Sequence, residues 1–146
     1  MAYTIGIFFI RLDNKLLICH PTGHPADVWT IPKGMPDEDD ADYFETGIRE
    51  LQEETNISYN EIKNDVSNIL RMENVLYKTN KKELISYLIK YSGNCEFNLK
   101  CNSFVRGNDY DFPEVDDYKW VDLHDAVNMV HESQSKIVSE LIRLIK

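Results

Sequence analysis

Apolar residues along this chain fall mainly into short runs, which predict strands, and into two stretches with helical spacing. The first two runs, at residues 3–11 and 15–20, are separated by the turn-like "LDN" and predict a hairpin. A second pair of alternating runs predicts another antiparallel pair further along. The predicted strands are residues 3–11, 15–20, 29–33 (ending near Pro32), 70–78, 83–91 and 117–123.

The longest helical pattern covers residues 42–55. One apolar stripe there contains Phe44, Ile48, Leu51 and Thr55, at positions i, i+4, i+7 and i+11. Gly47 lies inside this helix at a cost of about 1 kcal/mol relative to alanine, which indicates that another element packs closely against it.

Two further helices are expected near the end of the sequence. A short helix begins after Asp122, which we expect to act as its N-cap. The last helix carries Ile137, Leu141, Leu144 and Ile145 at helical spacing. The order of strands, helix, strands and helices predicts an α/β sandwich whose sheet is mixed and mostly antiparallel. With 146 residues, of which 42% are hydrophobic, we expect one domain over residues 1–146.

Charge and cysteine content narrow the classes of protein to consider. The net charge of −9 argues against binding a nucleic-acid backbone. The three cysteines are an odd number, which argues against a disulfide framework and favours a reducing, cytoplasmic location. No apolar run approaches the roughly 20 residues that span a bilayer, and the opening segment has the character of a first strand rather than a signal peptide.

Three glutamates stand where negative charge is unfavourable. Glu50, Glu53 and Glu54 lie in the last turns of the predicted helix, where the helix dipole disfavours each anion by about 0.3–1 kcal/mol. Glu50 is also an i,i+3 or i,i+4 neighbour of the other two, so the carboxylates repel one another. Two interpretations are open: a solvated acidic helix face, or a site for a hard cation, Mg²⁺ or Mn²⁺.

The segment "WTIPKGMPDEDDADYFETGIRELQEETNI" resembles the signature box of the Nudix hydrolase family. Gly34 matches the opening glycine of that box. The second half is matched by Arg49, Glu50, Leu51, Glu53, Glu54 and Ile57. The resemblance implies a Nudix-type α/β/α sandwich.

The sequence departs from the family pattern at three points. The spacing from Gly34 to Arg49 is one residue longer than in the box. Ala41 occupies the place of the first glutamate, whose role of orienting the arginine could pass to Asp40 or Asp42. Asn56 replaces the last glycine, which is a mild change because asparagine also tolerates the left-handed conformation after a helix.

The resemblance implies hydrolysis of a phosphoanhydride in a nucleoside diphosphate linked to another group, with Mg²⁺ or Mn²⁺ as cofactor. It implies metal ligation by Glu50, Glu53, Glu54 and the Gly34 carbonyl, with Glu50 also a candidate base. Arg49 is expected to hold a glutamate in position, and Lys33 to meet a phosphate as a point charge. The base of this family often lies outside the box, and Glu114 in "FPEVDD" is the candidate.

The segment "WTIPKG", which leads into the box, also resembles the corresponding segment of family members that act on dinucleoside polyphosphates. This resemblance makes dinucleoside polyphosphates the preferred substrate. The alternatives are ADP-ribose, a non-standard nucleoside triphosphate, a Nudix-like domain that binds nucleotide with little or no turnover, and an acidic protein-interaction module. Phe104, Tyr110 and Phe112 could stack on a base or could anchor their own loop. We expect a nucleotide as the partner, no membrane, and leave a homodimer open.

Overall fold

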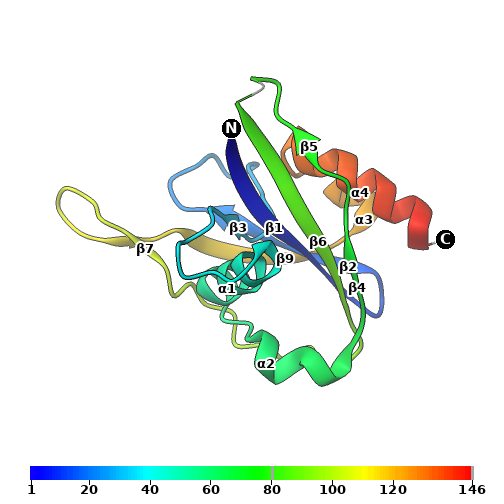
Figure 1. Ribbon diagram of the computed structural model, residues 1–146. Helices are drawn as coiled ribbons and strands as arrows, with labels where there is room; N and C mark the ends of the chain where they lie inside the picture. Colours follow the sequence, from blue (N-terminus) through cyan, green and yellow to red (C-terminus); the bar gives the residue numbers. More distant parts are fainter. Residues whose placement is uncertain (80, 146) are drawn as a thin grey trace.

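The computed structural model describes residues 1–79 and 81–145, which form a layered α/β structure around one mixed sheet. The sheet order is β4-β6-β1-β2-β9, while β3 pairs with β1 and β5 pairs with β6 (Figure 1). The strands of this sheet are β1 (Ala2–Arg11), β2 (Lys15–Pro21), β3 (Lys33–Gly34), β4 (Val66–Arg71), β5 (Val75–Leu76), β6 (Lys82–Tyr91) and β9 (Val115–Asp122).

The central strand β1 is buried on both faces. Its side chains alternate between two apolar clusters: Phe8 and Ile10 join one, and Ile7 and Phe9 join the other. β1 runs parallel to β6 over its whole length, whereas the other pairs in the sheet are antiparallel. The expected mixed, mostly antiparallel sheet is therefore confirmed. The parallel pair itself was not predicted, because strand periodicity reports burial and not the choice of partner.

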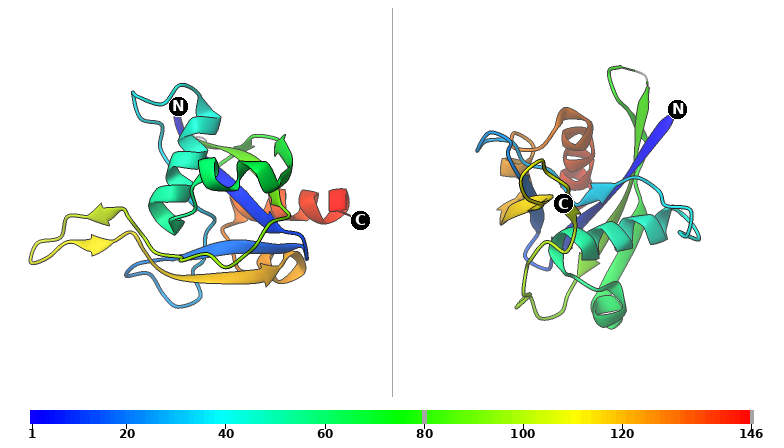
Figure 2. Two further views of the ribbon diagram at one scale, coloured as in Figure 1. Left: turned by 90° about the horizontal axis from the view of Figure 1, so that it is seen from below. Right: turned by 90° about the vertical axis from the view of Figure 1, so that its left-hand side faces the viewer.

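Helices cover both faces of the sheet and complete the sandwich. Figure 2 shows α1 (Tyr43–Thr55) and α2 (Tyr59–Ile62) on one side, and α4 (Glu132–Ile145) on the other. A 3₁₀ turn, η1 (Lys63–Asp65), follows α2, and α3 (Leu123–Ala126) precedes α4. Within residues 1–79 and 81–145, no helix has both the length and the apolar character needed to cross a bilayer.

Most predicted elements are present with small changes. The helix predicted for 42–55 is α1, and Asp42 is its N-cap, accepting a hydrogen bond from the Glu45 N–H at 2.8 Å. The strand predicted for 70–78 is in fact two strands, β4 and β5, both antiparallel to β6. Asp122 occupies the N-cap position of α3, although its side chain makes no capping bond there.

The helix predicted at the end of the sequence is α4, in which Ile137 and Leu141 are buried and Leu144 is 54% exposed. One prediction about the remaining segments was wrong. The segment predicted as a loop at 102–113 contains a small hairpin of β7 (Phe104–Val105) and β8 (Phe112–Pro113). α2 was missed, although Ser58 and Glu61 have the spacing of a capping box.

The segment predicted as extended, residues 29–33, lies between β1 and β2. β1 and β2 pair with each other near their connecting turn, where Ile10 lies opposite Leu16. Further along, Thr30 bridges to Cys19 of β2, and the Pro32 carbonyl accepts from the Ile7 N–H of β1 at 3.0 Å. β3 then continues alongside β1 and delivers Gly34 to the side of the sheet covered by α1.

The close approach predicted at Gly47 is confirmed, and Ile7 is the residue that makes it. A Cβ on Gly47 would lie 2.7 Å from Ile7 Cδ1 and 3.3 Å from its Cγ1. We expect Gly47→Ala to lower the free energy of unfolding by about 1–2 kcal/mol, because overpacking outweighs the gain in helix propensity. Urea unfolding measures this change.

A double variant isolates the cause. Ile7→Val removes the Cδ1 methyl that the new Cβ would meet, so Ile7→Val/Gly47→Ala should lose less stability than the sum of the single changes. Strict additivity in that cycle would contradict the contact as the reason for glycine.

Candidate metal centre

Three glutamates from two distant parts of the chain meet beside the C-terminal half of α1. Glu50 and Glu54 lie one turn apart on this helix, and Glu114 immediately precedes β9. One carboxylate oxygen from each lies within 4.8 Å of those of the other two. Glu50 and Glu54 are only 7% and 5% exposed, and Glu114 is partly buried. Oxygen donors gathered at this spacing suit a hard divalent cation.

The charges of this cluster are poorly compensated within the protein. Burial raises the pKa of Glu54 well above the ordinary value, and the carboxylates of Glu50 and Glu114 raise it further. Burial also raises the pKa of Glu50, followed by repulsion from Glu53 and opposed by Arg49. A cation of charge +2 would stabilise the ionised form of both carboxylates and so oppose both shifts, so the donor set fits such an ion on electrostatic grounds as well as by ligand type.

β3 lies directly against the two buried carboxylates. The Lys33 N–H donates to Glu54 Oε1 at 3.3 Å. A Cβ on Gly34 would stand 2.1 Å from Glu50 Cδ, so any other residue there would displace the Glu50 carboxylate. The requirement for glycine at this position is therefore one of space. The Gly34 carbonyl receives a long contact of 3.5 Å from Thr4 Oγ1.

Arg49 is held by the acidic loop that precedes α1. Its Nε and Nη2 donate to the two oxygens of Asp40, each at 3.0 Å, and Nη2 also donates to the Met35 carbonyl at 3.0 Å. Its Nη1 donates to Glu50 Oε1 at 3.0 Å. The hydrogen bonds from Arg49 lower the pKa of Asp40 to about 2.

Asp40 therefore makes the contact to Arg49 that Ala41, which has no carboxylate, cannot make. Asp42, the other residue considered for this role, caps α1 instead. Thr46 Oγ1 also donates to Asp40 at 2.8 Å and helps to hold it beside Arg49.

Glu53 lies apart from the cluster of the other three glutamates. Its side chain is 38% exposed, and both of its oxygens accept from Arg49 Nη1 at 3.2 Å. Of the expected metal ligands on α1, the structure thus brings Glu50 and Glu54 together with Glu114, and places Glu53 on the solvent side of Arg49.

The C-terminal end of α1 is closed by donors from elsewhere in the chain. Each of the last four helix carbonyls, from Gln52 to Thr55, accepts a hydrogen bond. The donors from other segments are the Asn102 N–H and side chain, the Lys100 N–H and the Tyr118 hydroxyl, while the Asn56 N–H closes the helix locally. Asn56 adopts the left-handed conformation, φ 68°, as expected for the residue that replaces glycine. These donors reduce the negative potential of the helix end on which the glutamates lie.

Glu114 is positioned through its backbone by two neighbouring segments. Its N–H donates to the Ser103 carbonyl at 2.9 Å, and its carbonyl accepts from the Thr22 N–H at 3.0 Å. Nearby, His20 Nδ1 lies 2.6 Å from Asp116 Oδ1 and His20 Nε2 lies 3.0 Å from the Pro25 carbonyl. The Asp116 contact raises the pKa of His20. These bonds join the loop after β2 to the start of β9.

Sequence reasoning did not identify the residues that support the site from a distance. Asn102, Tyr118 and His20 belong to no motif, and their roles depend on segments that meet only in the folded chain. The available signal for Asp40 was the count forward from Gly34, which puts Asp40 where the box has its first glutamate and so distinguishes it from Asp42.

Glu54→Gln separates stability from cation binding. Because the pKa of Glu54 is raised on folding, its contribution to stability is present below about pH 4.5 and is lost as pH rises through the raised pKa. At pH 8 without metal, the variant should therefore be more stable than the wild type by about 1–3 kcal/mol, roughly 3–10 °C in Tm. The difference should vanish near pH 4.

Thermal melts in chelator and in Mg²⁺ test this prediction. Mg²⁺ should raise the Tm of the wild type and leave that of Glu54→Gln nearly unchanged. Glu96→Gln, a change at an exposed glutamate, is the matched control. Equal stabilisation of all three proteins by Mg²⁺ would remove Glu54 from the cation site.

Asp40 and Asp42 offer a matched pair of substitutions in one loop. Asp40→Asn loses the charged partner of Arg49 and should weaken Mg²⁺ binding about tenfold or more, the usual effect of removing a residue that orients a ligand. Asp42→Asn keeps a good helix cap and should change neither Mg²⁺ affinity nor stability appreciably. Calorimetric titration with Mg²⁺ measures both, and equal effects would contradict the assignment of Asp40.

Comparison with known proteins identifies the family and agrees with the fold. The NUDIX domain family model matches residues 2–141. The curated RNA pyrophosphohydrolase of Pelagibacter ubique is 24% identical over 147 residues, covering 97% of this chain and 89% of that protein.

Solved structures show the same fold. The Ap4A hydrolase of C. elegans, in a binary complex, superposes with a TM-score of 0.69 at 21% identity, with 97% of each chain covered. The NUDIX domain of Shewanella oneidensis NrtR, complexed with ADP ribose, gives 0.73 at 17% identity, covering 100% of this chain and 89% of that one. The family match over nearly the whole chain is decisive: this protein belongs to the Nudix family and is a pyrophosphohydrolase.

Proposed function

We propose that this enzyme hydrolyses a phosphoanhydride bond of a dinucleoside polyphosphate with Mg²⁺, or Mn²⁺ in its place, as cofactor. The observation that carries the proposal is the convergence of Glu50, Glu54 and Glu114, two of them buried, beside the backbone of Gly34. Such a carboxylate set suits a hard cation, and a polyphosphate is the substrate whose charge most needs one.

In this proposal, Glu50, Glu54 and Glu114 hold the cation, together with the Gly34 carbonyl. Glu53 adds a ligand from the solvent side, next to Arg49. When bound, the cation neutralises phosphate oxygens and lowers the pKa of a water molecule.

The chain's own groups then orient the water and accept its proton. The water oxygen forms a bond to phosphorus, the bridging P–O bond breaks, and the leaving phosphate keeps the electron pair. Glu50 or Glu114 accepts the proton, because both lie at the cluster where the water would stand. Arg49, fixed by Asp40, holds Glu50 in place, and Lys33 adds a positive charge beside Glu54.

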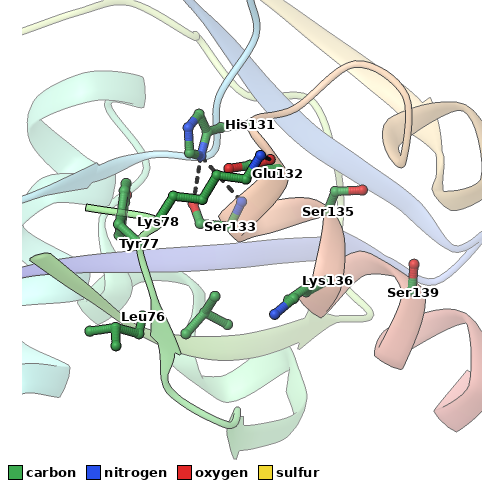
Figure 3. Close-up of a pocket in the computed structure, with 10 residues that line it drawn as sticks. Leu76, Tyr77, Lys78, His131, Glu132, Ser133, Ser135, Lys136 and Ser139 are labelled. Atoms are coloured by element: carbon green, nitrogen blue, oxygen red, sulfur yellow. Dashed lines mark hydrogen bonds and ion pairs between the residues drawn. The ribbon is translucent and has the colours of Figure 1, made fainter. Parts of the chain in front are cut away.

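A cavity at the start of α4 supports a nucleoside as part of the substrate. It has a volume of about 290 Å³ and is lined by residues of β5 and α4 and of the segments next to them (Figure 3). Tyr77 and His131 stack there with ring centroids 5.4 Å apart, and Lys78 pairs with Glu132 at 3.1 Å. A planar base could add to this aromatic stack.

The cavity is linked to the carboxylates by a short stretch of chain. Gln134 of α4 accepts from the Ile31 N–H at 3.0 Å and donates to Thr30 Oγ1 at 2.8 Å. Lys33, two residues after Ile31, contacts Glu54. Residues 30–33 thus connect the start of α4, on one face of the sheet, with the carboxylates beside α1 on the other.

The free cysteines Cys19, Cys95 and Cys101 are consistent with the proposed cytoplasmic location. A second candidate function is the hydrolysis or binding of ADP-ribose. It is favoured by the similarity to the NrtR NUDIX domain, which was solved with ADP ribose.

The proposal is tested by incubating the purified protein with Mg²⁺ and one of four compounds, then identifying the products. The compounds are diadenosine tetraphosphate, ADP-ribose, ATP and RNA that carries a 5′-triphosphate. We expect the highest kcat/KM for diadenosine tetraphosphate. Glu54→Gln and Glu114→Gln should each reduce kcat at least a hundredfold, because each removes a group needed in the transition state, while Glu96→Gln should retain the wild-type rate.

Other outcomes identify the alternatives. A higher kcat/KM for ADP-ribose would establish the second candidate. Metal-independent binding of a nucleotide without cleavage of any compound would identify a binding domain. A full rate for well-folded Glu54→Gln would contradict the assignment of the centre.

A further inference from the structure

The hairpin of β7 and β8 forms an arm that projects from the body of the domain. Figure 1 and the left view of Figure 2 show this arm, residues 103–113, extending beyond every other element. Within the described part of the chain, no side chain from 104 to 113 makes a recorded hydrogen bond or ion pair with the body.

The arm exposes aromatic side chains that do not stabilise it. Phe104 is 61% exposed and Tyr110 is 75% exposed, whereas Phe112 is partly covered. Of the two roles considered for these rings, anchoring the loop therefore does not apply to Phe104 and Tyr110. Large rings left in water on a projecting element indicate a ligand or partner.

The root of the arm is fixed to the metal centre on both sides. Before β7, the Asn102 N–H donates to the Glu53 carbonyl at 2.6 Å. After β8 comes Glu114, whose carboxylate belongs to the cluster. Phe104 pairs with Pro113, the neighbour of Glu114. The root of the arm, with Phe104, therefore lies next in the chain to a carboxylate of the centre.

The charge of the arm selects among possible occupants. It carries Arg106 but also Asp109 and Asp111, in a chain of net charge −9. This balance disfavours the phosphate backbone of RNA and an anionic membrane, and it also disfavours a second, equally acidic copy of the chain. A neutral planar group attached to a polyphosphate that is already held at the centre meets none of these penalties.

We propose that the exposed rings of the arm, Phe104 near its root and Tyr110 toward its tip, offer two stacking surfaces for the nucleobase at the far end of the substrate. This inference rests on the proposed dinucleoside polyphosphate hydrolase function. It makes the arm the element that distinguishes a substrate with two nucleosides from one with a single nucleoside, since stacking on an aromatic ring is favourable for any base.

The test compares diadenosine tetraphosphate with adenosine tetraphosphate, which lacks only the second nucleoside. Phe104→Ala/Tyr110→Ala should raise KM for diadenosine tetraphosphate about tenfold or more. Its kcat for that substrate, and both constants for adenosine tetraphosphate, should stay as in the wild type. Phe104→Trp/Tyr110→Phe keeps both rings and should restore the low KM. Leu12→Ala, at a 66% exposed apolar residue away from the arm, is the control.

Three results would overturn the inference: no change in either KM, an equal loss on both substrates, or a wild-type dimer that the alanine variant converts to a monomer with its KM values unchanged. Size-exclusion chromatography with light scattering measures the oligomeric state and so detects the last result.

Binding tests the arm even without turnover. Calorimetric titration of non-hydrolysable, methylene-bridged analogues of both compounds into the protein with Mg²⁺, with and without the arm substitutions, measures the same preference as a ratio of Kd values. An identical Kd for both compounds in protein with an intact arm would refute the stacking site. If Kd shows the preference while the wild type cleaves nothing, the proposed hydrolase function fails and the stacking site stands.

Discussion

The main constraint on this structure is a pair of carboxylates, Glu50 and Glu54, buried one turn apart at the negative end of α1. The surrounding elements are arranged around them. Glu50 and Glu54 are almost fully enclosed, and burial raises the pKa of each. A protein optimised for stability alone would place apolar residues there, because an uncompensated buried charge is among the most costly features of a fold. The arrangement makes physical sense when a divalent cation completes it.

The neighbouring elements keep this unfavourable cluster in place. Tertiary donors satisfy the last carbonyls of α1, so the helix does not fray where its charges repel one another. Gly34 makes room for Glu50, and Arg49, itself held by Asp40, takes up part of the negative charge. The stability of the rest of the domain, with β1 buried on both faces, supports this local cost.

The same supports connect the centre to two surfaces that could receive a substrate. Through Thr30 and Ile31, the segment between β1 and β2 reaches the cavity beside α4. Through Asn102 and Glu114, the centre reaches the root of the projecting arm. The first connection is made by the side chain of Gln134 and the second by backbone hydrogen bonds of Asn102 and Glu114.

What the sequence determined by itself was local. Apolar spacing defined α1, the helical period placed Glu50 and Glu54 on one side, and asparagine at position 56 suited the left-handed helix end. The resemblance of the box to a family identified the chemistry. The tertiary structure decided what depends on contacts between distant residues: the parallel pairing of β1 with β6, the choice of Asp40 over Asp42, the turning of Glu53 toward Arg49, and the arrival of Glu114 from the root of the arm. Periodicity and spacing describe a segment relative to its own axis. Which segment lies against it, and which of several nearby carboxylates faces inward, is determined only by how the whole chain packs.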